Sequence, residues 1–313
     1  MHRLNFKCVL AALFSLFIFS RFQSTAQTLS IEGRWDLTVN MNGRMAPSWL
    51  EVRHSGTNGY IGHFVADGGS ARPISKVNFK EGKMSFHIPA QWEVTNKELL
   101  LDGELSADGT LGGTMTTTSG RVFTWVGVRA PKLWREKTPV WGKPISLFNG
   151  KNFDGWEVMG NNQWVVEDGI LKSPTSGANI RTTKTFDDFK LHIEFRYPKG
   201  SNSGVYLRGR YEIQIEDTKG LEPLSIYLGG IYGFIDPWLN MAKEAGEWQS
   251  YDVTLVGRMV TLLVNGQTVI YKQEIPGITG GAIDSNESAP GPIMMQGDHG
   301  PIEFRNIMIT LTK

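Results

Sequence analysis

The chain has 313 residues, of which 40% are hydrophobic and 20% charged, with 32 Lys and Arg against 31 Asp and Glu. These values exclude a disordered or fibrous protein, and the balanced charge gives no indication of binding to nucleic acid or to an anionic membrane surface. The length allows two domains of ordinary size, and the 36 glycines and 14 prolines favour short strands joined by tight turns.

The first 26 residues have the pattern of a secretory signal peptide. Arg3 and Lys7 give a positive start, a mostly apolar run follows at residues 8–20, and residues 24–26 form a small-residue cleavage site. The apolar run is shorter than the roughly 20 residues that a permanent membrane span needs. We therefore expect cleavage after Ala26 and a periplasmic or secreted product.

The single cysteine, Cys8, lies at the start of this apolar run rather than after it, which argues against a lipid anchor. The mature chain would then contain no cysteine, which excludes disulfides, a thiol nucleophile and a cysteine metal site. Cleavage removes Arg3, Lys7 and Arg21 and no acid, so 29 basic residues remain against 31 acidic ones, a net charge of −2. A neutral partner such as a sugar is compatible with this balance.

Residues 27–130 predict a first, small all-β domain. Seven or eight short alternating segments bounded by Gly, Asn and Asp are typical of an antiparallel barrel or sandwich. The first segment contains Gly33-Arg34-Trp35, which resembles the Gly-x-Trp at the start of lipocalin-like barrels, where the Trp closes one end. Three histidines fall on different strands without metal-ligand spacing, and we interpret them as surface or hydrogen-bonded residues. They are His54, His63 and His87.

Residues 131–144 contain several prolines and two tryptophans and are interpreted as a linker packed against one or both domains. From residue 145 to residue 313 the alternating segments resume, and Asn265-Gly266 between two apolar runs predicts a tight hairpin. The less regular segment 217–247 predicts long loops over one sheet face, where binding groups usually lie. The expected architecture is a two-sheet jelly-roll sandwich with one sheet curved and its outer face open as a groove.

Three neighbouring segments of this second domain alternate with period two. They are residues 189–197, 204–209 and 211–217, and the turns between them are short. We therefore expect antiparallel neighbours whose outward side chains form one surface. The outward side chains would be His192, Glu194 and Arg196, then Tyr206 and Arg208, then Glu212, Gln214 and Glu216.

Such a surface suits a carbohydrate, because amide, guanidinium and carboxylate groups bind vicinal hydroxyls and aromatic rings stack on sugar faces. An ordinary solvent-exposed sheet face is the alternative, and alternation alone favours it. Jelly-roll glycosidases place two carboxylates on such a strand as nucleophile and acid. Gln214 between Glu212 and Glu216 departs from their pattern, so direct hydrolysis by two carboxylates is disfavoured.

A second candidate group lies near the carboxyl end. Gly297 and Gly300 flank Asp298-His299 and predict a tight turn that presents both side chains beyond a strand end, while Gln296 projects from that strand. His299 is suited to proton transfer near neutral pH, and a neighbouring carboxylate would orient it or raise its pKa. A structural histidine in a turn is the alternative.

With these segments in order, residues 147–307 resemble the family of 3-keto-disaccharide hydrolases. The resemblance implies a concanavalin-like jelly roll and, as substrates, glycosides that a partner dehydrogenase has oxidised to a ketone at C3. Family members commonly have an aliphatic residue at the position of Glu216 and lack an equivalent of Gly297. Residues 27–130 are not covered. The matching segments are "LFNGKNFDGWE", "FKLHIEFRYPKGSNSGVYLRG", "YEIQIED", "GGIYG", "AGEWQSYDVTLVGRMVTLLVNG" and "GPIMMQGDHGPIEFRNI".

The resemblance implies elimination chemistry. A ketone at C3 makes the C2 proton acidic, so a base can remove it, and the C1 substituent departs with help from an acid. Water can add to the unsaturated product, which gives net hydrolysis; without that step the protein is a lyase. The site must supply a base, an acid and a group that stabilises the enolate oxygen.

On this hypothesis Glu212 or His299 transfers the protons and Arg208 stabilises the enolate. Glu194 would orient Arg208, and Asp298 would orient His299. The hypothesis assigns no cofactor, and a divalent cation held by Glu212 and His299 is an alternative to the arginine. The expected substrate-binding residues are Glu194, Asn202, Tyr206, Gln214, Gln296 and Asp298.

A non-catalytic carbohydrate-binding module on the same jelly roll is the rival hypothesis, and a conventional jelly-roll glycosidase is a third. Glu212, Arg208 and His299 meeting in one pocket would favour the enzyme. If His299 lay on the opposite side of the sandwich from Glu212, the proposed mechanism would be wrong.

Overall fold

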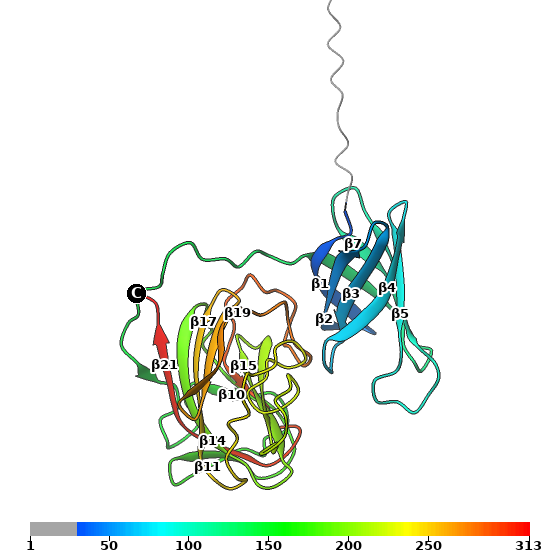
Figure 1. Ribbon diagram of the computed structural model, residues 1–313. Coiled ribbons are helices and arrows are strands. Elements are labelled where there is room, and N and C mark those ends of the chain that lie inside the picture. The colour runs from blue at the N-terminus through cyan, green and yellow to red at the C-terminus, as the bar shows by residue number, and fades with distance from the viewer. Residues whose placement is uncertain (1–29) are drawn as a thin grey trace, which may run out of the picture.

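The computed structural model describes residues 30–313, and every helix or strand assigned in that range is a β-strand (Figure 1). The expected signal peptide, with Cys8 and the cleavage after Ala26, lies outside the described residues. Between residues 30 and 313 there is no helix whose length and apolarity would let it span a membrane. The prediction of an all-β protein is confirmed.

The first eight strands form a closed antiparallel barrel in which each strand pairs with the next and the last pairs back with the first. This resolves the expected barrel or sandwich in favour of an eight-stranded up-and-down barrel of lipocalin type. Trp35 is fully buried in its core, and its indole N–H donates to the carbonyl oxygen of Ile31. The strands are β1 (Gly33–Met41), β2 (Arg44–Ser55), β3 (Gly59–Val65), β4 (Arg72–Lys80), β5 (Lys83–Ile88), β6 (Leu99–Leu105), β7 (Leu111–Thr116) and β8 (Val122–Arg129).

The remaining strands form a sandwich of two sheets (Figure 1). The five-stranded sheet has the order β10 (Trp156–Val158), β13 (Ile180–Thr182), β20 (Met294–Met295), β15 (Asn202–Leu207) and β16 (Tyr211–Glu216). The larger sheet has the order β11 (Val165–Glu167), β12 (Ile170–Ser173), β21 (Ile302–Leu311), β14 (Phe189–Arg196), β17 (Gln249–Val256), β18 (Met259–Val264) and β19 (Gln267–Glu274), with β9 (Ile145–Ser146) beside β21.

The hydrophobic core lies between these two sheets, as the alternation predicts. Phe189, Ile193 and Phe195 of β14 belong to the same buried cluster as Val205 of β15 and Ile213 of β16. The alternate residues of β15 and β16 therefore point away from the core, onto the outer face of the five-stranded sheet.

The expectation that the three alternating segments are neighbours in one sheet is wrong for the first of them. β14 pairs with β17 and β21, whereas β15 pairs with β16 and β20. The short stretch after β14 carries the chain from one sheet to the other. Alternation determines which side chains share one face of a strand, but it does not determine which strand lies alongside.

The outer edge of the five-stranded sheet is paired with a loop segment. The segment after β16 returns along the free edge of that strand, where the Gln214 N–H donates to Gly230 O at 2.9 Å and the Tyr232 N–H donates to Glu212 O at 3.0 Å. This pairing leaves no unpaired strand edge there. The side chains of Glu212 and Gln214, on the outer face of that strand, are buried instead of solvent-exposed.

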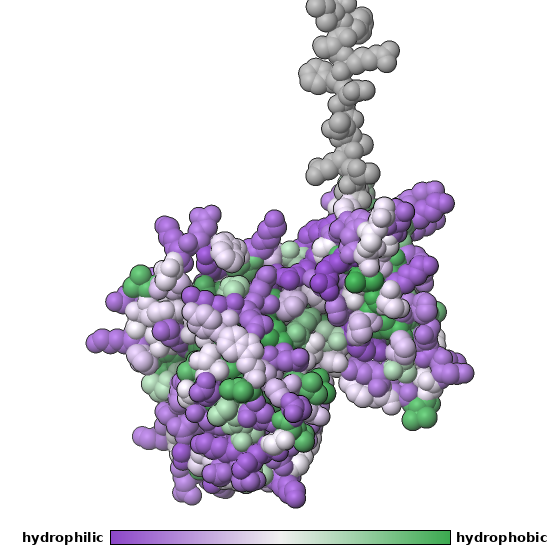
Figure 2. Space-filling model, in the orientation of Figure 1, coloured by the Kyte–Doolittle hydropathy of each residue, from purple (hydrophilic) through white to green (hydrophobic). Residues whose placement is uncertain are grey.

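The barrel packs closely against the sandwich, beside the loops that join its strands (Figure 1). Trp49 of β2 is fully buried in the hydrophobic cluster of the sandwich, and its ring meets the ring of Phe234 edge to face at 5.2 Å. The N–H of Gly281 donates to the carbonyl oxygen of Asp67 at 2.9 Å. The connecting segment is held to the sandwich by Arg135, which pairs with two consecutive aspartates, Asp187 and Asp188. On the face drawn in Figure 2, hydrophilic residues dominate the surface of both bodies.

Candidate functional site

A polar cavity of about 450 Å³ lies over the outer face of the five-stranded sheet, where the sandwich meets the barrel. Strand residues, loop residues and barrel residues all contribute to its walls. The sheet supplies Asn202, Tyr206, Glu212 and Gln214; the loops supply Asn179, Tyr232, Gly280, Gly281, Ala282, Gln296, Asp298 and His299; the barrel supplies Arg44, Asp67, Gly68, Gly69 and Trp92.

Glu212 is the buried acid of this cavity, with only 3% of its surface exposed. It lies opposite Tyr206 in the β15–β16 ladder, and the tyrosine hydroxyl is 2.9 Å from its Oε2. Burial raises the pKa of Glu212 to about 8, against the lowering effects of the Tyr206 hydrogen bond and of the charge on His299. A carboxyl with this pKa changes its protonation state near neutral pH, which is a property of groups that transfer protons.

Gly204 makes room for this carboxyl group. It lies on β15, diagonally across from Glu212, and a Cβ atom built on it would overlap Oε1 of Glu212. A side chain at position 204 would therefore displace the carboxylate. Gly204 stands in the resembling segment "SNSGVYLRG", but its role follows only from the pairing of the two strands.

Asp298 and His299 follow β20 and line the same cavity. Nδ1 of His299 is 2.7 Å from Oδ1 of Asp298, and this hydrogen bond is the largest cause of the raised pKa of His299. Both side chains are exposed, in contrast to Glu212. With Nδ1 held by the carboxylate, Nε2 is the atom available for proton exchange with a ligand.

The turn around this pair is fixed by backbone contacts. The Gly297 N–H donates to Oδ1 of Asn179 at 2.8 Å, and the Ser176 hydroxyl donates to the Asp298 carbonyl oxygen. A Cβ atom at Gly297 would overlap the carbonyl oxygen of Ala178. The backbone packs so closely here that only glycine fits at the position that departs from the family pattern.

Two glutamine side chains line the cavity, one from β16 and one directly after β20. Gln296 is buried, and its Oε1 has no hydrogen-bond partner among residues 30–313. A buried acceptor without a partner in a polar cavity is a position where a ligand hydroxyl can donate. The amide of Gln214 already makes part of its possible hydrogen bonds within the protein, because its Nε2 donates to the Ile226 carbonyl oxygen at 3.3 Å. Asn202 and Tyr206 also line the cavity, as the sequence predicts.

Arg208 is a correction to the predicted site. Its side chain is fully buried away from the cavity, where its guanidinium donates to Asp187 at 3.1 Å and to the Tyr211 hydroxyl at 2.7 Å. β15 ends at Leu207, and Arg208 adopts a positive φ of 52° in the turn that follows. Strand alternation therefore does not apply at this position, and the arginine turns away from Glu212.

Glu194 also lies outside the cavity. It belongs to β14 in the larger sheet, where it accepts hydrogen bonds from Arg305 at 2.6 Å and Asn306 at 3.0 Å. It therefore cannot orient Arg208. His192 of the same strand pairs with Asp252 at 2.7 Å.

The sequence analysis missed the residues that the barrel contributes. Arg44, Asp67 and Trp92 are separated from the rest of the site by more than 80 residues of chain, and no spacing pattern connects them to it. The one available signal was Trp92, a tryptophan in an irregular stretch between two predicted strands. Tyr232 and Asn179 were missed because they lie in loops without periodicity.

The arrangement of potential metal ligands bears on the alternative of a divalent cation. Within residues 30–313 no group of three or more His, Cys, Asp or Glu side chains is arranged to hold a metal ion. The three barrel histidines each lie beside a different glutamate: His54 beside Glu32, His63 beside Glu51 and His87 beside Glu98.

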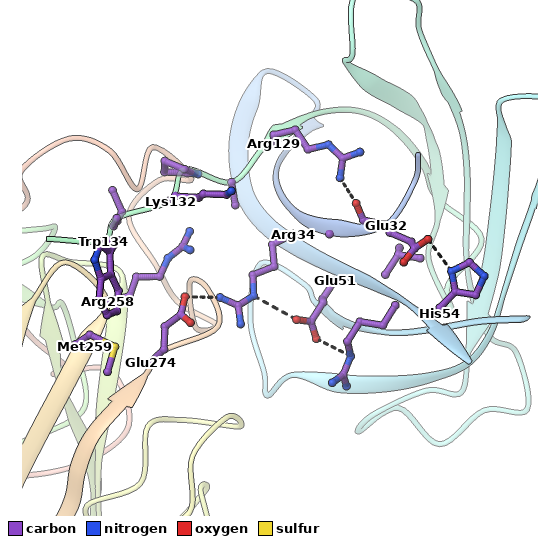
Figure 3. A pocket seen from close by; sticks show the side chains of 16 residues that line it. Glu32, Arg34, Glu51, His54, Arg129, Lys132, Trp134, Arg258, Met259 and Glu274 are labelled. Atoms are coloured by element: carbon purple, nitrogen blue, oxygen red, sulfur yellow. Dashed lines mark hydrogen bonds and ion pairs between the residues drawn. The ribbon is translucent and has the colours of Figure 1, made fainter. Parts of the chain in front are cut away.

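A larger cavity of about 820 Å³ lies between the barrel, the connecting segment and the sandwich (Figure 3). Several of its charged groups pair with one another: Arg34 contacts Glu274 at 2.7 Å and Glu51 at 3.2 Å, and Glu51 also contacts Arg53. None of the predicted site residues lines it. The smaller cavity, with Glu212 and His299, is therefore the candidate functional site.

Comparison with known proteins gives the following matches. The family model described as the 3-keto-alpha-glucoside-1,2-lyase-like domain matches residues 143–310, more than half of the chain. A 3-keto-disaccharide hydrolase of Bacteroides thetaiotaomicron is 32% identical over 98 residues, which cover 26% of this chain and 33% of that relative. The match thus spans about a third of the relative's length.

Among solved structures, a predicted glycosyl hydrolase of Parabacteroides distasonis is similar over 56% of this chain and 92% of its own, with 29% identity and a TM-score of 0.46. A carbohydrate-binding module of Bacillus subtilis is similar over 49% of this chain and 93% of its own, with 12% identity and a TM-score of 0.36.

Proposed function

The chain belongs to the 3-keto-alpha-glucoside-1,2-lyase-like family, and from this premise we propose that its cavity cleaves 3-keto-glycosides by removing the C2 proton and eliminating the C1 substituent. The observation that carries the proposal is that Glu212 and the Asp298–His299 pair line one cavity. A buried carboxyl with a pKa of about 8 and an imidazole with a raised pKa supply the two proton-transfer groups that the elimination needs.

In the proposed reaction ionised Glu212 is the base. Its carboxylate takes the C2 proton, and the electrons of the broken C–H bond form an enolate with the C3 ketone. A carboxylate of pKa about 8 is a stronger base than an exposed one, because the burial that raises its pKa also destabilises its charge. Tyr206 holds the carboxylate in place through its hydroxyl.

The second step expels the substituent at C1. The enolate electrons form a C1–C2 double bond as the C1–O bond breaks, and protonated His299 gives its Nε2 proton to the departing oxygen. Asp298 keeps His299 protonated by accepting from Nδ1. Addition of water across the double bond then yields the free 3-keto sugar, and omission of this step leaves an unsaturated product.

The enolate oxygen requires hydrogen-bond donors other than Arg208, which lies elsewhere. The candidates that line the cavity are the hydroxyl of Tyr232 and the amide N–H groups of Gln296 and Asn202. Donors fixed where negative charge develops stabilise the transition state more than the ground state.

The proposal includes a source for the substrate. An oxidised glycoside must be supplied by a dehydrogenase that converts the C3 hydroxyl to a ketone. We infer from the pattern of the first 26 residues that the protein meets this substrate after export to the periplasm or the medium.

The test uses a 3-keto-glucoside with a nitrophenyl leaving group and the unoxidised glucoside as control. The expected result is nitrophenol release from the keto substrate alone. Release from both substrates would overturn the keto-sugar assignment, and release from neither would favour a carbohydrate-binding module. Run in D₂O, a hydrolytic product should carry deuterium at C2, because that carbon regains its hydrogen from solvent; a product without deuterium there contradicts elimination.

A further inference from the structure

The loop between β3 and β4 of the barrel reaches the mouth of the candidate site and is held there by backbone contacts. The N–H of Gly281 donates to the carbonyl oxygen of Asp67 at 2.9 Å. A Cβ atom at Gly280 would overlap the backbone of Gly69, so the backbones of the two loops are in direct contact, with no side chain between them. The Gly280 carbonyl in turn lies 2.9 Å from the hydroxyl of Tyr206, the residue that holds Glu212. These contacts fix the position of the barrel loop relative to Tyr206 and Glu212.

Trp92 presents an indole ring at this mouth. It lies in the connection between β5 and β6, lines the cavity and is 67% exposed. A Cβ at Gly69 would overlap the ring, which shows that the indole packs directly on the glycine backbone. An exposed indole supported on one side offers a flat apolar surface to a ligand, and the apolar faces of sugar rings stack on such surfaces.

Arg44 and Asp67 form a polar pair beside the same opening. Two N–H groups of the guanidinium donate to the two carboxylate oxygens, at 3.1 and 2.5 Å, and both residues line the cavity. Both side chains are more than a third exposed, so the guanidinium retains donors and the carboxylate retains acceptor positions. A donor and an acceptor side by side match the vicinal hydroxyls of a sugar.

The cavity has a buried inner end and an exposed mouth. Glu212, Gln214 and Gln296 are buried at its inner end, whereas Trp92 and Arg44 are exposed at its mouth. The ring that loses its C2 proton must lie at the inner end, next to Glu212. In a disaccharide the second ring is attached through C1, so it must extend toward the mouth.

We propose that the barrel forms the binding subsite for the departing sugar, with Trp92 stacking on its ring and the Arg44–Asp67 pair binding its hydroxyls. This proposal rests on the proposed function and assigns a role to a domain outside the family match at residues 143–310. It assigns recognition of the second ring of the substrate to the barrel.

The first test is a ratio of kcat/KM for a 3-keto-disaccharide to kcat/KM for methyl 3-keto-glucoside, which lacks the second ring. Trp92→Ala should lower this ratio about tenfold, because the stacking contact is lost only for the disaccharide. Arg44→Ala should lower it in the same direction. Trp134→Ala is the control, because Trp134 is 71% exposed and lines a different cavity. An unchanged ratio in Trp92→Ala, or an equal fall in the control, would overturn the subsite.

The second test does not depend on catalysis. Calorimetric titration of Glu212→Gln with an unoxidised disaccharide and with methyl glucoside should show tighter binding of the disaccharide, and adding Trp92→Ala should remove this advantage. Failure of the wild type to cleave either keto substrate would count against the proposed function alone, because this titration still decides the subsite. Equal affinity for the two ligands with Trp92 intact would overturn it.

Discussion

The hydroxyl oxygen of Tyr206 lies 2.9 Å from Oε2 of Glu212 and also 2.9 Å from the carbonyl oxygen of Gly280. The hydroxyl has one proton and can donate to only one of them. When Glu212 is protonated it can donate to Tyr206, while Tyr206 donates to the carbonyl; when Glu212 ionises, the hydroxyl proton can turn toward the carboxylate. Both protonation states are therefore satisfied without movement of heavy atoms, as a group that gains and loses a proton in each turnover requires.

Replacement of Glu212 by Gln should abolish cleavage of the keto substrate. The amide preserves size but cannot take the C2 proton, so we expect a loss in kcat/KM of at least about 100-fold. Glu216→Gln is the matched control, because Glu216 is on the same strand, four residues further along, and does not line the cavity. Retained activity in Glu212→Gln, or an equal loss in the control, would transfer the role of base to another group.

The same substitution should change how stability depends on pH. The folded-state pKa of Glu212, about 8, exceeds the ordinary value of 4.5, so folding favours its protonated form. The stabilisation is complete below pH 4.5 and is lost as the pH rises toward 8, by up to about 1.4 kcal/mol per pH unit. Urea unfolding should therefore show the wild type losing stability relative to Glu212→Gln over this range, and parallel curves would contradict the raised pKa.

Gly204→Ala should impair activity more than folding. Its methyl group would overlap the Glu212 carboxylate, and the end of that side chain can move away at the cost of its position in the cavity. We expect a fall in kcat/KM of about 100-fold or more, because a misplaced proton-transfer group is catalytically ineffective. Thermal unfolding of the variant is the accompanying measurement. Normal activity would show that the carboxylate position is not critical.

Asp298→Asn should move the pH optimum to lower values. The Asp298 carboxylate raises the pKa of His299 through a hydrogen bond and raises that of Glu212 through its charge, so its removal lowers both. The acidic and the basic side of the profile of kcat/KM against pH should therefore both move to lower pH. This expectation holds whichever of the two groups determines each side of the profile.

Asp252→Asn is the control for that shift. Asp252 makes a hydrogen bond of the same 2.7 Å length to His192, but on the outer face of the larger sheet. Its profile of kcat/KM against pH should match the wild type. An optimum that stays in place in Asp298→Asn would contradict the proposed partnership.

Asp36→Asn should stabilise the junction between barrel and sandwich. Asp36 is buried, and its Oδ1 has no hydrogen-bond partner in the described part of the chain. Burial is the largest cause that raises the pKa of Asp36 well above its ordinary value, and the charge of Glu287 is the second. Folding therefore requires proton uptake above about pH 4, a cost that grows with pH and that the neutral amide avoids. We expect a gain on the order of 2 kcal/mol in the free energy of unfolding at pH 7 and little gain at pH 4. A loss at pH 7 would show that Asp36 folds ionised.

Much of the fold could be read from local patterns. Alternation along β14, β15 and β16 identified which residues face the core, and Asn265-Gly266 marked the hairpin whose strands pair Val264 with Gln267. Turn chemistry and the period of two act over a few residues, so they are present in the sequence itself.

The same patterns identified Glu212, Gln214, Gln296 and His299, which all line one cavity. They could not place Glu194 or Arg208 correctly. Glu194 depends on which sheet β14 joins, and Arg208 depends on where β15 ends and its turn begins. Strand partners are chosen by packing between distant segments, which no local period records.

The sequence by itself determined the all-β class, the faces of the strands and the group of polar residues that resembles the family. Only the tertiary structure decided that these residues are buried and that the barrel completes their cavity. The physical reason is that the pKa of Glu212 is raised mainly by burial, and the cavity around Glu212 is walled by loops and a second domain that are far away in the chain, including Gly281 and Asp67.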